Sequence, residues 1–276
     1  TTRYELEEGV TRLIEVVQEK IAQNQDGPII VQIAGGSASG KTSQVADRVK
    51  IAFGDEAQII SMDNYYRGVS YMNEQAANGN DLNWDQPEAL NLEELRGNLA
   101  RLKRGEEIEE PIYSFVTGER EGSRKVSPAK VIIAEGLFAL NDSLVAEGDI
   151  HAFVDIGAHG RIIRRLLRDV ERTGQNPKDI LEYFADVVEP MHEKYVQSTI
   201  DNASIIISNE YSAEREAGRS GSSESQLKFP AGGIDAETLR KASAEVLGHT
   251  QQIDKYYNSK DRDLSQNGES LRIREE

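Results

Sequence analysis

The feature that most constrains this chain is a glycine-rich loop, IAGGSASGKTS, at residues 33–43. It has the spacing Gly35-x-x-x-x-Gly40-Lys41-Thr42, which is typical of loops that hold phosphate groups with backbone N–H groups. An apolar, β-rich run at 29–35 precedes the loop, and a helical pattern at 41–53 follows it. A strand, a phosphate-binding loop and a helix in this order predict a nucleoside triphosphate site within an α/β fold.

The residues of this loop are candidates for binding a nucleotide and its metal ion. The Lys41 ammonium would reach the β- and γ-phosphates, and the Thr42 hydroxyl would bind Mg²⁺. A chance match in a turn is the alternative, which the flanking strand and helix disfavour. The pattern does not tell whether the phosphoryl group goes to water or to another acceptor. The nucleotide-binding candidates are Gly35, Gly36, Ser37, Ala38, Ser39, Gly40, Lys41, Thr42 and Ser43.

Apolar runs alternate with helical patterns over the first 210 residues. Short β-rich runs lie at 29–35, 57–63, 130–136, 150–156 and 203–208, and helical spacing occurs at 4–24, 41–53, 87–104, 140–148, 160–172 and 177–200. This alternation predicts an α/β fold of the P-loop NTPase type, in which a parallel sheet carries helices on both faces. After residue 210 the chain becomes rich in Ser, Gly and charged residues, as linkers are.

Composition narrows the classes of partner. With 38% hydrophobic and 29% charged residues, the chain is expected to be a soluble globular protein. A formal net charge of −16 argues against nucleic-acid and anionic-membrane partners, since both require a basic face. The chain has no cysteine, which suits a cytoplasmic protein, and it has no apolar run long enough to span a membrane. A homo-oligomer stays open.

Two acidic residues stand where predicted parallel strands end. Asp63 ends the second strand, at the sheet edge where open α/β folds bind ligands, so its carboxylate could take the proton of an attacking hydroxyl. An ordinary turn residue is the alternative for Asp63. Glu135 ends a wholly apolar strand and is a candidate magnesium partner, with a surface strand-end residue as the alternative.

Five arginines follow one another at helical steps in an otherwise acidic chain: Arg161, Arg164, Arg165, Arg168 and Arg172. A helix that carries several guanidinium groups can close over phosphates and neutralise charge during phosphoryl transfer. The alternative is a solvated helix face paired with neighbouring acids. That alternative is preferred for Arg161 and Arg172, whereas phosphate contact is preferred for Arg165 and Arg168.

The order of these stretches resembles the uridine kinase and phosphoribulokinase group of P-loop kinases over about residues 28–210. The resemblance rests on GGSASGKTS, SMDNYYRG, NWDQPEALN, PIYSFVTGERE, VIIAEGLFAL, RIIRRLLRDVERTG and VVEPMHEKYVQSTIDNASIII, which occur in that order. It implies an ATP- and Mg²⁺-dependent kinase in which Asp63 is the catalytic base. Lys41 and Thr42 would hold triphosphate and metal, Glu135 would assist the metal, and the arginine segment, with Arg165 and Arg168, would form a lid.

The resemblance also implies where the acceptor binds. Tyr66, Asp85, Tyr113 and Phe115 fall where uridine kinases hold ribose and base, and Arg120 would remain on the sugar side. Uridine kinases commonly carry a base-contacting His in the stretch where this chain has Thr117-Gly118. The loss of that donor predicts weak discrimination between uridine and cytidine, or a ribose-like acceptor without a pyrimidine. Gly118→His would shift the preference toward pyrimidines if the backbone accepts a side chain there.

Further departures concern the lid and the histidines. The stretch ERTGQ stands where uridine kinases usually read ERGR, so one cation of the lid is missing. The four histidines are not spaced for metal binding and are given no catalytic role; they are His151, His159, His192 and His249.

The C-terminal tail carries a second resemblance, to the early strands of a CYTH domain, the triphosphate tunnel fold. Such domains open with an E-x-E-x-K strand, and here Glu224, Gln226 and Lys228 stand in that pattern. Lys228, Arg272 and Arg274 are candidate triphosphate-binding bases, and an ordinary exposed strand is the alternative. We expect a partial α+β CYTH-like segment with a strand and a helix, followed by two strands around a turn.

Together these observations predict four segments: an N-terminal helix at 1–27, a P-loop kinase domain at 28–210, a linker at 211–223 and the partial CYTH-like segment at 224–276. The expected activity is transfer of the γ-phosphoryl group of ATP to a hydroxyl of a nucleoside or ribose-like small molecule. The alternative is a nucleotide-binding regulatory module of a CYTH phosphohydrolase that acts on pyrophosphate or triphosphate.

Overall fold

The structure is a computed structural model, and it describes residues 1–23, 27–210, 253–257 and 271–275. The chain divides into two compact units, Thr1–Ser243 and Ala244–Glu276. In the first unit, apolar strands build a parallel sheet, and the phosphate loop and the other site residues lie along its edge. The second unit contributes one strand pair.

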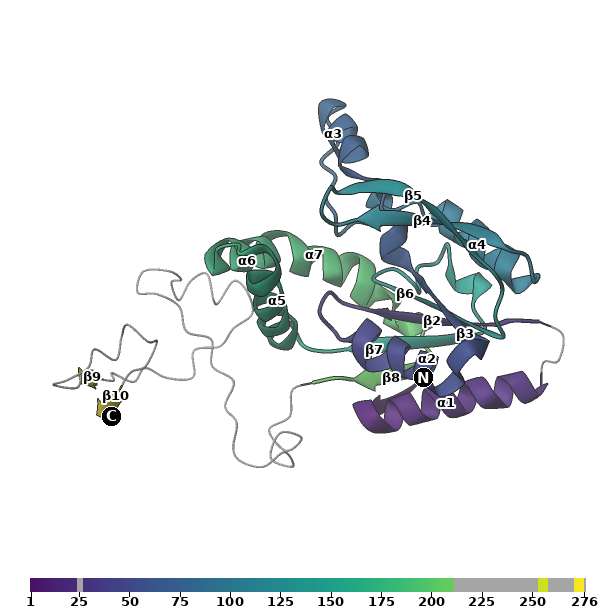
Figure 1. Cartoon of the computed structure of the whole chain (residues 1–276), viewed down its shortest axis with the longest axis horizontal. Helices are drawn as coiled ribbons and strands as arrows, with labels where there is room; N and C mark the ends of the chain where they lie inside the picture. Colours follow the sequence, from purple (N-terminus) through teal and green to yellow (C-terminus); the bar gives the residue numbers. More distant parts are fainter. Residues whose placement is uncertain (24–26, 211–252, 258–270, 276) are drawn as a thin grey trace. The chain divides into compact units, whose positions relative to one another are not determined.

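Six parallel strands form the sheet of the first unit, in the order β1-β8-β7-β2-β6-β3 (Figure 1). Their bounds are β1 (Thr2–Glu5), β2 (Ile29–Gly35), β3 (Ala57–Ser61), β6 (Val131–Gly136), β7 (Ile150–Asp155) and β8 (Ile205–Ser208). Every residue of β2 and β6 is buried, because both strands lie inside the sheet with helices above and below. The parallel α/β sheet predicted from the sequence is therefore confirmed.

Helices cover both faces of this sheet (Figure 1). On one face, α1 (Leu6–Gln23) and α2 (Asp47–Phe53) bury an apolar stripe that includes Val10, Leu13 and Val49. On the other face, α4 (Leu92–Lys103) buries Leu95, Leu99 and Leu102. The remaining helices are α3 (Val69–Ala77), α5 (Ala158–Thr173), α6 (Pro177–Tyr183) and α7 (Glu189–Met191).

Short irregular helical turns connect these elements. Turns of π type span Lys41–Ala46, Phe184–Val188 and His192–Val196, and 3₁₀ turns span Gly54–Glu56, Met62–Tyr65, Pro87–Ala89, Val145–Glu147 and Gln197–Asn202. The helical pattern at 177–200 is thus confirmed as a run of α, π and 3₁₀ turns. The pattern at 140–148 is wrong as a helix, because the Asn141 side chain accepts from the Ser143 N–H and holds a turn instead.

Four elements of the first unit were not predicted, namely β1, α3, β4 and β5. Strand β1 precedes the N-terminal helix and pairs with β8, so the segment 1–27 is not a helix alone but supplies an edge strand of the sheet. An antiparallel hairpin of β4 (Ile108–Ser114) and β5 (Glu119–Val126) lies beside α4 and carries much of the predicted acceptor stretch. Strands β1 and β5 are largely exposed, and β4 mixes buried and exposed residues, so none of the three leaves the apolar run that marks a buried strand.

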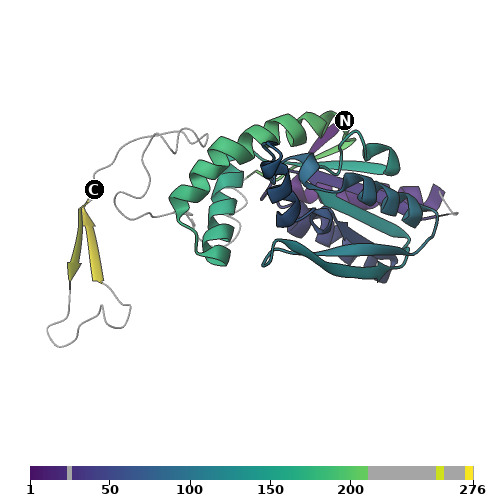
Figure 2. The ribbon, with the colours of Figure 1, turned by 90° about the horizontal axis from the view of Figure 1, so that it is seen from above.

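The second unit contains β9 (Ile253–Tyr257) and β10 (Leu271–Glu275), which pair antiparallel (Figure 2). Arg272 stands opposite Tyr256 and Arg274 opposite Asp254, which confirms two strands in the tail. The predicted linker and Glu224, Gln226, Lys228 and His249 lie outside the described residues. Over the part of the chain that the structure describes, no helix is both long and apolar enough to cross a membrane.

Candidate active site

The phosphate loop leaves the end of β2 and enters the turn at Lys41–Ala46. Inside it, the Ser39 N–H donates to the Gly36 carbonyl at 3.1 Å, which closes a tight turn. Ala38 has a φ of 61°, the only positive φ of a non-glycine residue in the described ranges, and Gly40 has a φ of 85°. Left-handed residues within such a tight turn direct backbone N–H groups toward one side of the loop, as an anion requires.

Close packing explains why residue 36 is a glycine. A Cβ atom there would lie 2.7 Å from the Arg161 side chain and 2.9 Å from the His192 ring. Arg161 is buried, donates to the Ile156 carbonyl at 2.7 Å and pairs with Glu189, so it supports the loop from inside the protein. The solvated helix face preferred for Arg161 is therefore wrong, because its side chain is buried and pairs with Glu189. The Arg172 side chain lies outside the described residues.

Three oxygen groups meet between the loop and strands β3 and β6. The Thr42 hydroxyl donates to Glu135 Oε2 at 3.0 Å, and the Ser61 hydroxyl donates to Glu135 Oε1 at 2.8 Å. The register of the sheet causes this meeting, since Ser61 stands opposite Glu135 on adjacent strands. Glu135 is buried, so its surface alternative is wrong, and Ser61 is a neighbour that the sequence analysis missed.

Asp63 is the second residue of the 3₁₀ turn that follows β3, on the same edge of the sheet. Burial raises the pKa of its carboxyl group above the usual value, and the negative charge of Glu135 adds to that rise. The cations Lys41 and Arg168 oppose it. The structure therefore brings together the acid, the lysine of the loop and a lid arginine that the sequence analysis placed in one site.

Arginines of α5, the predicted lid, reach the phosphate loop. Arg165 Nη1 donates to the Ser37 hydroxyl at 3.2 Å, and Arg164 Nη1 donates to the Ser39 carbonyl at 3.2 Å. Arg168 pairs with Asp169 at 2.7 Å. Arg164 was in the lid segment but had no assigned contact, because helical spacing does not tell which residues meet the loop.

Aromatic rings line the acceptor side. The Tyr66 ring lies 5.7 Å from Trp84 and 5.4 Å from Tyr113, and Tyr113 lies 5.2 Å from Phe115. Phe115 is 74% exposed, so one face of this row is open. The Asp63 charge contributes to raising the pKa of both Tyr66 and Tyr113, after burial, which places the acid beside this row. Trp84 was missed, although it precedes Asp85 in the quoted stretch.

Asp85 connects the acceptor side with the lid. The Tyr183 hydroxyl at the end of α6 donates to Asp85 Oδ2 at 3.4 Å, and the Arg165 guanidinium lies 5.8 Å from the Tyr183 ring centroid. Burial raises the pKa of Asp85, while Arg165 and the Tyr183 hydrogen bond oppose the rise. Tyr183 had no signal in the sequence, because its role depends on how α6 folds back.

Arg120 is placed differently from the other acceptor candidates. Its guanidinium donates to the Tyr66 carbonyl at 2.8 Å and the Tyr65 carbonyl at 2.9 Å, and it pairs with Glu94 at 2.7 Å. These contacts hold the turn after β3 against the hairpin. Arg120 thus supports the residues around Asp63 rather than presenting free donors to a sugar.

The stretch that lacks the base-reading histidine forms the tip of the β4–β5 hairpin. The Thr117 hydroxyl is exposed and donates to Glu121 at 2.8 Å. Gly118 has a φ of +70°, and a Cβ atom there would lie 2.6 Å from Val69 Cγ2. A side chain at position 118 would be strained by the backbone angle and would have to displace Val69, which opposes the condition attached to Gly118→His.

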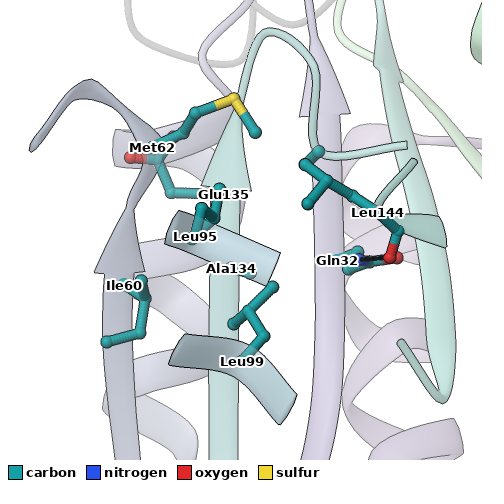
Figure 3. Close-up of a pocket in the computed structure, with 9 residues that line it drawn as sticks. Gln32, Ile60, Met62, Leu95, Leu99, Ala134, Glu135 and Leu144 are labelled. Atoms are coloured by element: carbon teal, nitrogen blue, oxygen red, sulfur yellow. Dashed lines mark hydrogen bonds between the residues drawn. The ribbon is translucent and has the colours of Figure 1, made fainter. Parts of the chain in front are cut away.

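A small pocket lies behind this site, between β2, β3, β6 and α4 (Figure 3). Its lining is aliphatic apart from Glu135 and Gln32, and the Gln32 side-chain amide donates to the Leu144 carbonyl at 2.8 Å. An apolar lining does not suit a phosphate or a sugar, so the site is defined by the residues of the sheet edge instead.

Comparisons with known proteins agree with this arrangement. The phosphoribulokinase and uridine kinase family model matches residues 30–213, and the CYTH domain model matches residues 224–276. The uridine kinase of Chlamydia pneumoniae is 37% identical over 187 residues, which cover 66% of this chain and 82% of that protein. The inorganic pyrophosphatase TTM2 of Arabidopsis thaliana is 33% identical over 211 residues, which cover 76% of this chain and 30% of that protein.

Solved structures share the fold. The D-glycerate 3-kinase of Cryptococcus neoformans var. grubii has a TM-score of 0.55 at 17% identity, over 72% of this chain and 95% of that one. The phosphoribulokinase of Rhodobacter spheroides has a TM-score of 0.53 at 17% identity, over 68% and 71%. Because the family model covers more than half of the chain, and the parallel sheet carries the loop and acids in the expected places, this protein belongs to the phosphoribulokinase and uridine kinase family.

Proposed function

We propose that this phosphotransferase transfers the γ-phosphoryl group of ATP to a hydroxyl of a nucleoside or another ribose-like small molecule. The position of Asp63 carries the proposal. On the phosphate side, the charges of Lys41 and Arg168 act to lower the pKa of its carboxyl group. On its other side, the Asp63 charge adds to the rise that burial causes in the pKa values of Tyr66 and Tyr113. A base between a phosphate loop and an aromatic acceptor row suits transfer from one to the other.

The chemistry follows from these contacts. The acceptor hydroxyl gives its proton to the Asp63 carboxylate, and its oxygen bonds to the γ-phosphorus as the bond to the ADP oxygen breaks. A pKa raised by burial makes Asp63 a stronger base. Lys41, Arg165 and Arg168 neutralise the charge that moves onto the leaving oxygen.

Mg²⁺ fits the groups present at the sheet edge. The Thr42 hydroxyl and the Glu135 carboxylate, 3.0 Å apart, are hard oxygen donors of the kind that this ion prefers. When bound, it would neutralise phosphate charge, with Thr42 and Glu135 as its protein partners.

The acceptor side favours a planar or sugar-like compound. Tyr66, Tyr113 and Phe115 offer ring faces, and the Asp85 carboxylate can accept hydrogen bonds from sugar hydroxyls. No base-reading histidine stands at Thr117-Gly118, so we expect weak discrimination between uridine and cytidine, or a ribose-like acceptor without a pyrimidine. A cytoplasmic location, homo-oligomerisation and the absence of nucleic-acid or membrane partners stay predictions.

The test is a screen of labelled ATP against nucleosides and pentose compounds, with a control that lacks acceptor. Asp63→Asn should leave ATP affinity unchanged and lower kcat by roughly 10²–10⁴, the range for losing a general base. Lys41→Ala should lower both ATP affinity and turnover, because it removes a charge between phosphates. An undiminished rate in Asp63→Asn with any accepted compound would contradict the assignment.

A second function is a regulatory module of a CYTH phosphohydrolase. The match of residues 224–276 to the CYTH model and the likeness to a plant inorganic pyrophosphatase favour it. In this case the first unit binds nucleotide with little transfer, and pyrophosphate or triphosphate is the compound consumed. Release of inorganic phosphate from either compound, with no phosphorylated acceptor in the screen, would favour this function over the kinase.

A further inference from the structure

The Ser39 carbonyl of the phosphate loop is held by two donors from outside the loop motif. The side-chain amide of Asn209 donates to it at 2.7 Å, and Arg164 Nη1 donates to it at 3.2 Å. Asn209 directly follows β8 and is only 2% exposed. A buried amide on a backbone carbonyl fixes the direction of that carbonyl, since breaking the bond takes this acceptor from a buried N–H donor.

Asn209 is itself held in place on two sides. Its backbone N–H donates to the Asp155 carbonyl at 2.9 Å, which continues the pairing of β7 with β8. Its carbonyl accepts from Arg164 Nη2 at 3.0 Å, so one guanidinium bridges Asn209 and Ser39. The position of the amide is therefore set by the sheet and by the lid helix.

The same amide packs against the next residue of the loop. Gly40 has a φ of +85°, and a Cβ atom at this position would lie 2.5 Å from Asn209 Nδ2. Asn209 thus contacts both residues that share the Ser39–Gly40 peptide unit. This contact gives a reason for glycine at position 40 beyond the backbone angle.

Through the geometry of the peptide unit, the contact of Asn209 with the Ser39 carbonyl also sets the direction of the Gly40 N–H. In a trans peptide, the carbonyl oxygen and the following N–H point in opposite directions. Holding the Ser39 carbonyl toward β8 directs the Gly40 N–H to the other side of the loop, where a phosphate would lie. We infer that Asn209, with Arg164, is a positioning residue for nucleotide binding, an inference that rests on the proposed nucleotide site.

Asn209→Ala and Asn209→Asp test this inference in the full chain. The alanine variant should raise the Kd for MgATP, measured by titration without acceptor, by roughly 3- to 12-fold, the range for one net hydrogen bond. The aspartate variant keeps the shape but sets an oxygen against the Ser39 carbonyl, so its loss should be at least as large. KM for ATP should rise while KM for the acceptor stays unchanged.

Asn202→Ala is the matched control, because the Asn202 amide donates to the Leu140 carbonyl at 3.0 Å, outside the phosphate loop. It should lower the unfolding temperature and leave ATP affinity unchanged.

If both Asn209 variants fold and bind MgATP as the unaltered chain does, the inference is overturned even when phosphoryl transfer is intact. If the unaltered chain binds MgATP but phosphorylates no acceptor, the proposed function fails and weaker binding by the Asn209 variants still supports the inference.

Discussion

Among single residues, His192 shows how the protein interior can fix a protonation state beside the phosphate loop. Its ring is buried, and Nε2 lies 3.0 Å from Gln197 Oε1, which can only accept, so Nε2 carries the hydrogen. Nδ1 has no partner among the described residues. Burial lowers the pKa of His192 to about 4, and the Arg161 charge contributes in the same direction. The folded protein therefore holds a neutral imidazole.

Acid should destabilise the protein through this residue. The unfolded chain binds a proton on His192 as the pH falls below about 6.5, whereas the folded chain resists until its pKa of about 4. The free energy of unfolding should then be about 2 kcal/mol lower at pH 5 than at pH 7 from this group. Urea titrations at the two pH values measure it, and His192→Gln should lose that part of the difference.

Thr199→Val is the control for this prediction. The Thr199 hydroxyl donates to the Val196 carbonyl at 2.7 Å in the same segment and does not titrate in this range. Its removal should lower the free energy of unfolding equally at both pH values. A His192→Gln protein that loses as much stability between pH 7 and pH 5 as the unaltered chain would show that His192 is not the group responsible.

Among the elements, the β4–β5 hairpin and the lid hold the acceptor side from two directions. The Val69 N–H donates to the Gly118 carbonyl at 2.8 Å, which joins α3 to the hairpin tip. From the lid, Tyr183 reaches Asp85 while Arg165 contacts Ser37 of the phosphate loop. The helices α5 and α6 thus contact both the donor and the acceptor sides, and α3 fixes the hairpin.

Gly118→Ala should loosen the hairpin tip. A left-handed φ costs about 1 kcal/mol for alanine, and the contact of 2.6 Å with Val69 should add about 1–3 kcal/mol. Gly105→Ala is the matched control, since its φ is +78° but nothing lies within 4 Å of the added atom. Thermal unfolding and KM for the acceptor are the measurements. Equal losses in the two variants would show that the contact with Val69 is relieved without cost.

The elements predicted from the sequence are those whose burial produces an apolar run or a periodic apolar face. Strands β2, β6 and β7 are apolar runs, and α1 has its apolar residues on one face, so period and composition identify them. Strand β1 is a short exposed edge, and β5 is mostly polar because most of its residues are exposed to water on both faces. Such strands are specified by their partners, which a local pattern does not contain.

The residues of the candidate site also fall into two groups, those predicted from sequence motifs and those seen only in the structure. The loop, Asp63, Glu135 and the lid arginines lie in ordered motifs, and the structure brings them to one edge of the sheet. Tyr183 and Asn209 lie in no motif, and their contacts come from the folding back of α6 and from the end of β8. Long-range contacts of this kind depend on packing, which the order of motifs does not fix.

Across the whole molecule, the described core belongs to the first 210 residues. Its three buried apolar clusters draw on residues between Leu6 and Ile207. The last described contact of the first unit is made by Glu210, whose carboxylate accepts from the Gly157 N–H at the start of α5. The described core, the arginine helix α5 and the phosphate loop therefore all lie before residue 211.

A fragment that ends at Glu210 should consequently fold and transfer phosphate by itself. The fragment keeps the three clusters and the Glu210 contact, so its unfolding temperature should lie within a few degrees of that of the full chain. Its kcat/KM for ATP and for the acceptor should lie within about twofold of the values of the full chain. The measurements are thermal unfolding and the labelled-ATP assay on both proteins, with Lys41→Ala in each as the background. A fragment that unfolds at the same temperature and binds MgATP, but transfers no phosphate while the full chain does, would show that residues 211–276 take part in the reaction. In that case a segment after Glu210 would have to contribute to phosphoryl transfer, and the first 210 residues would not be an independent kinase.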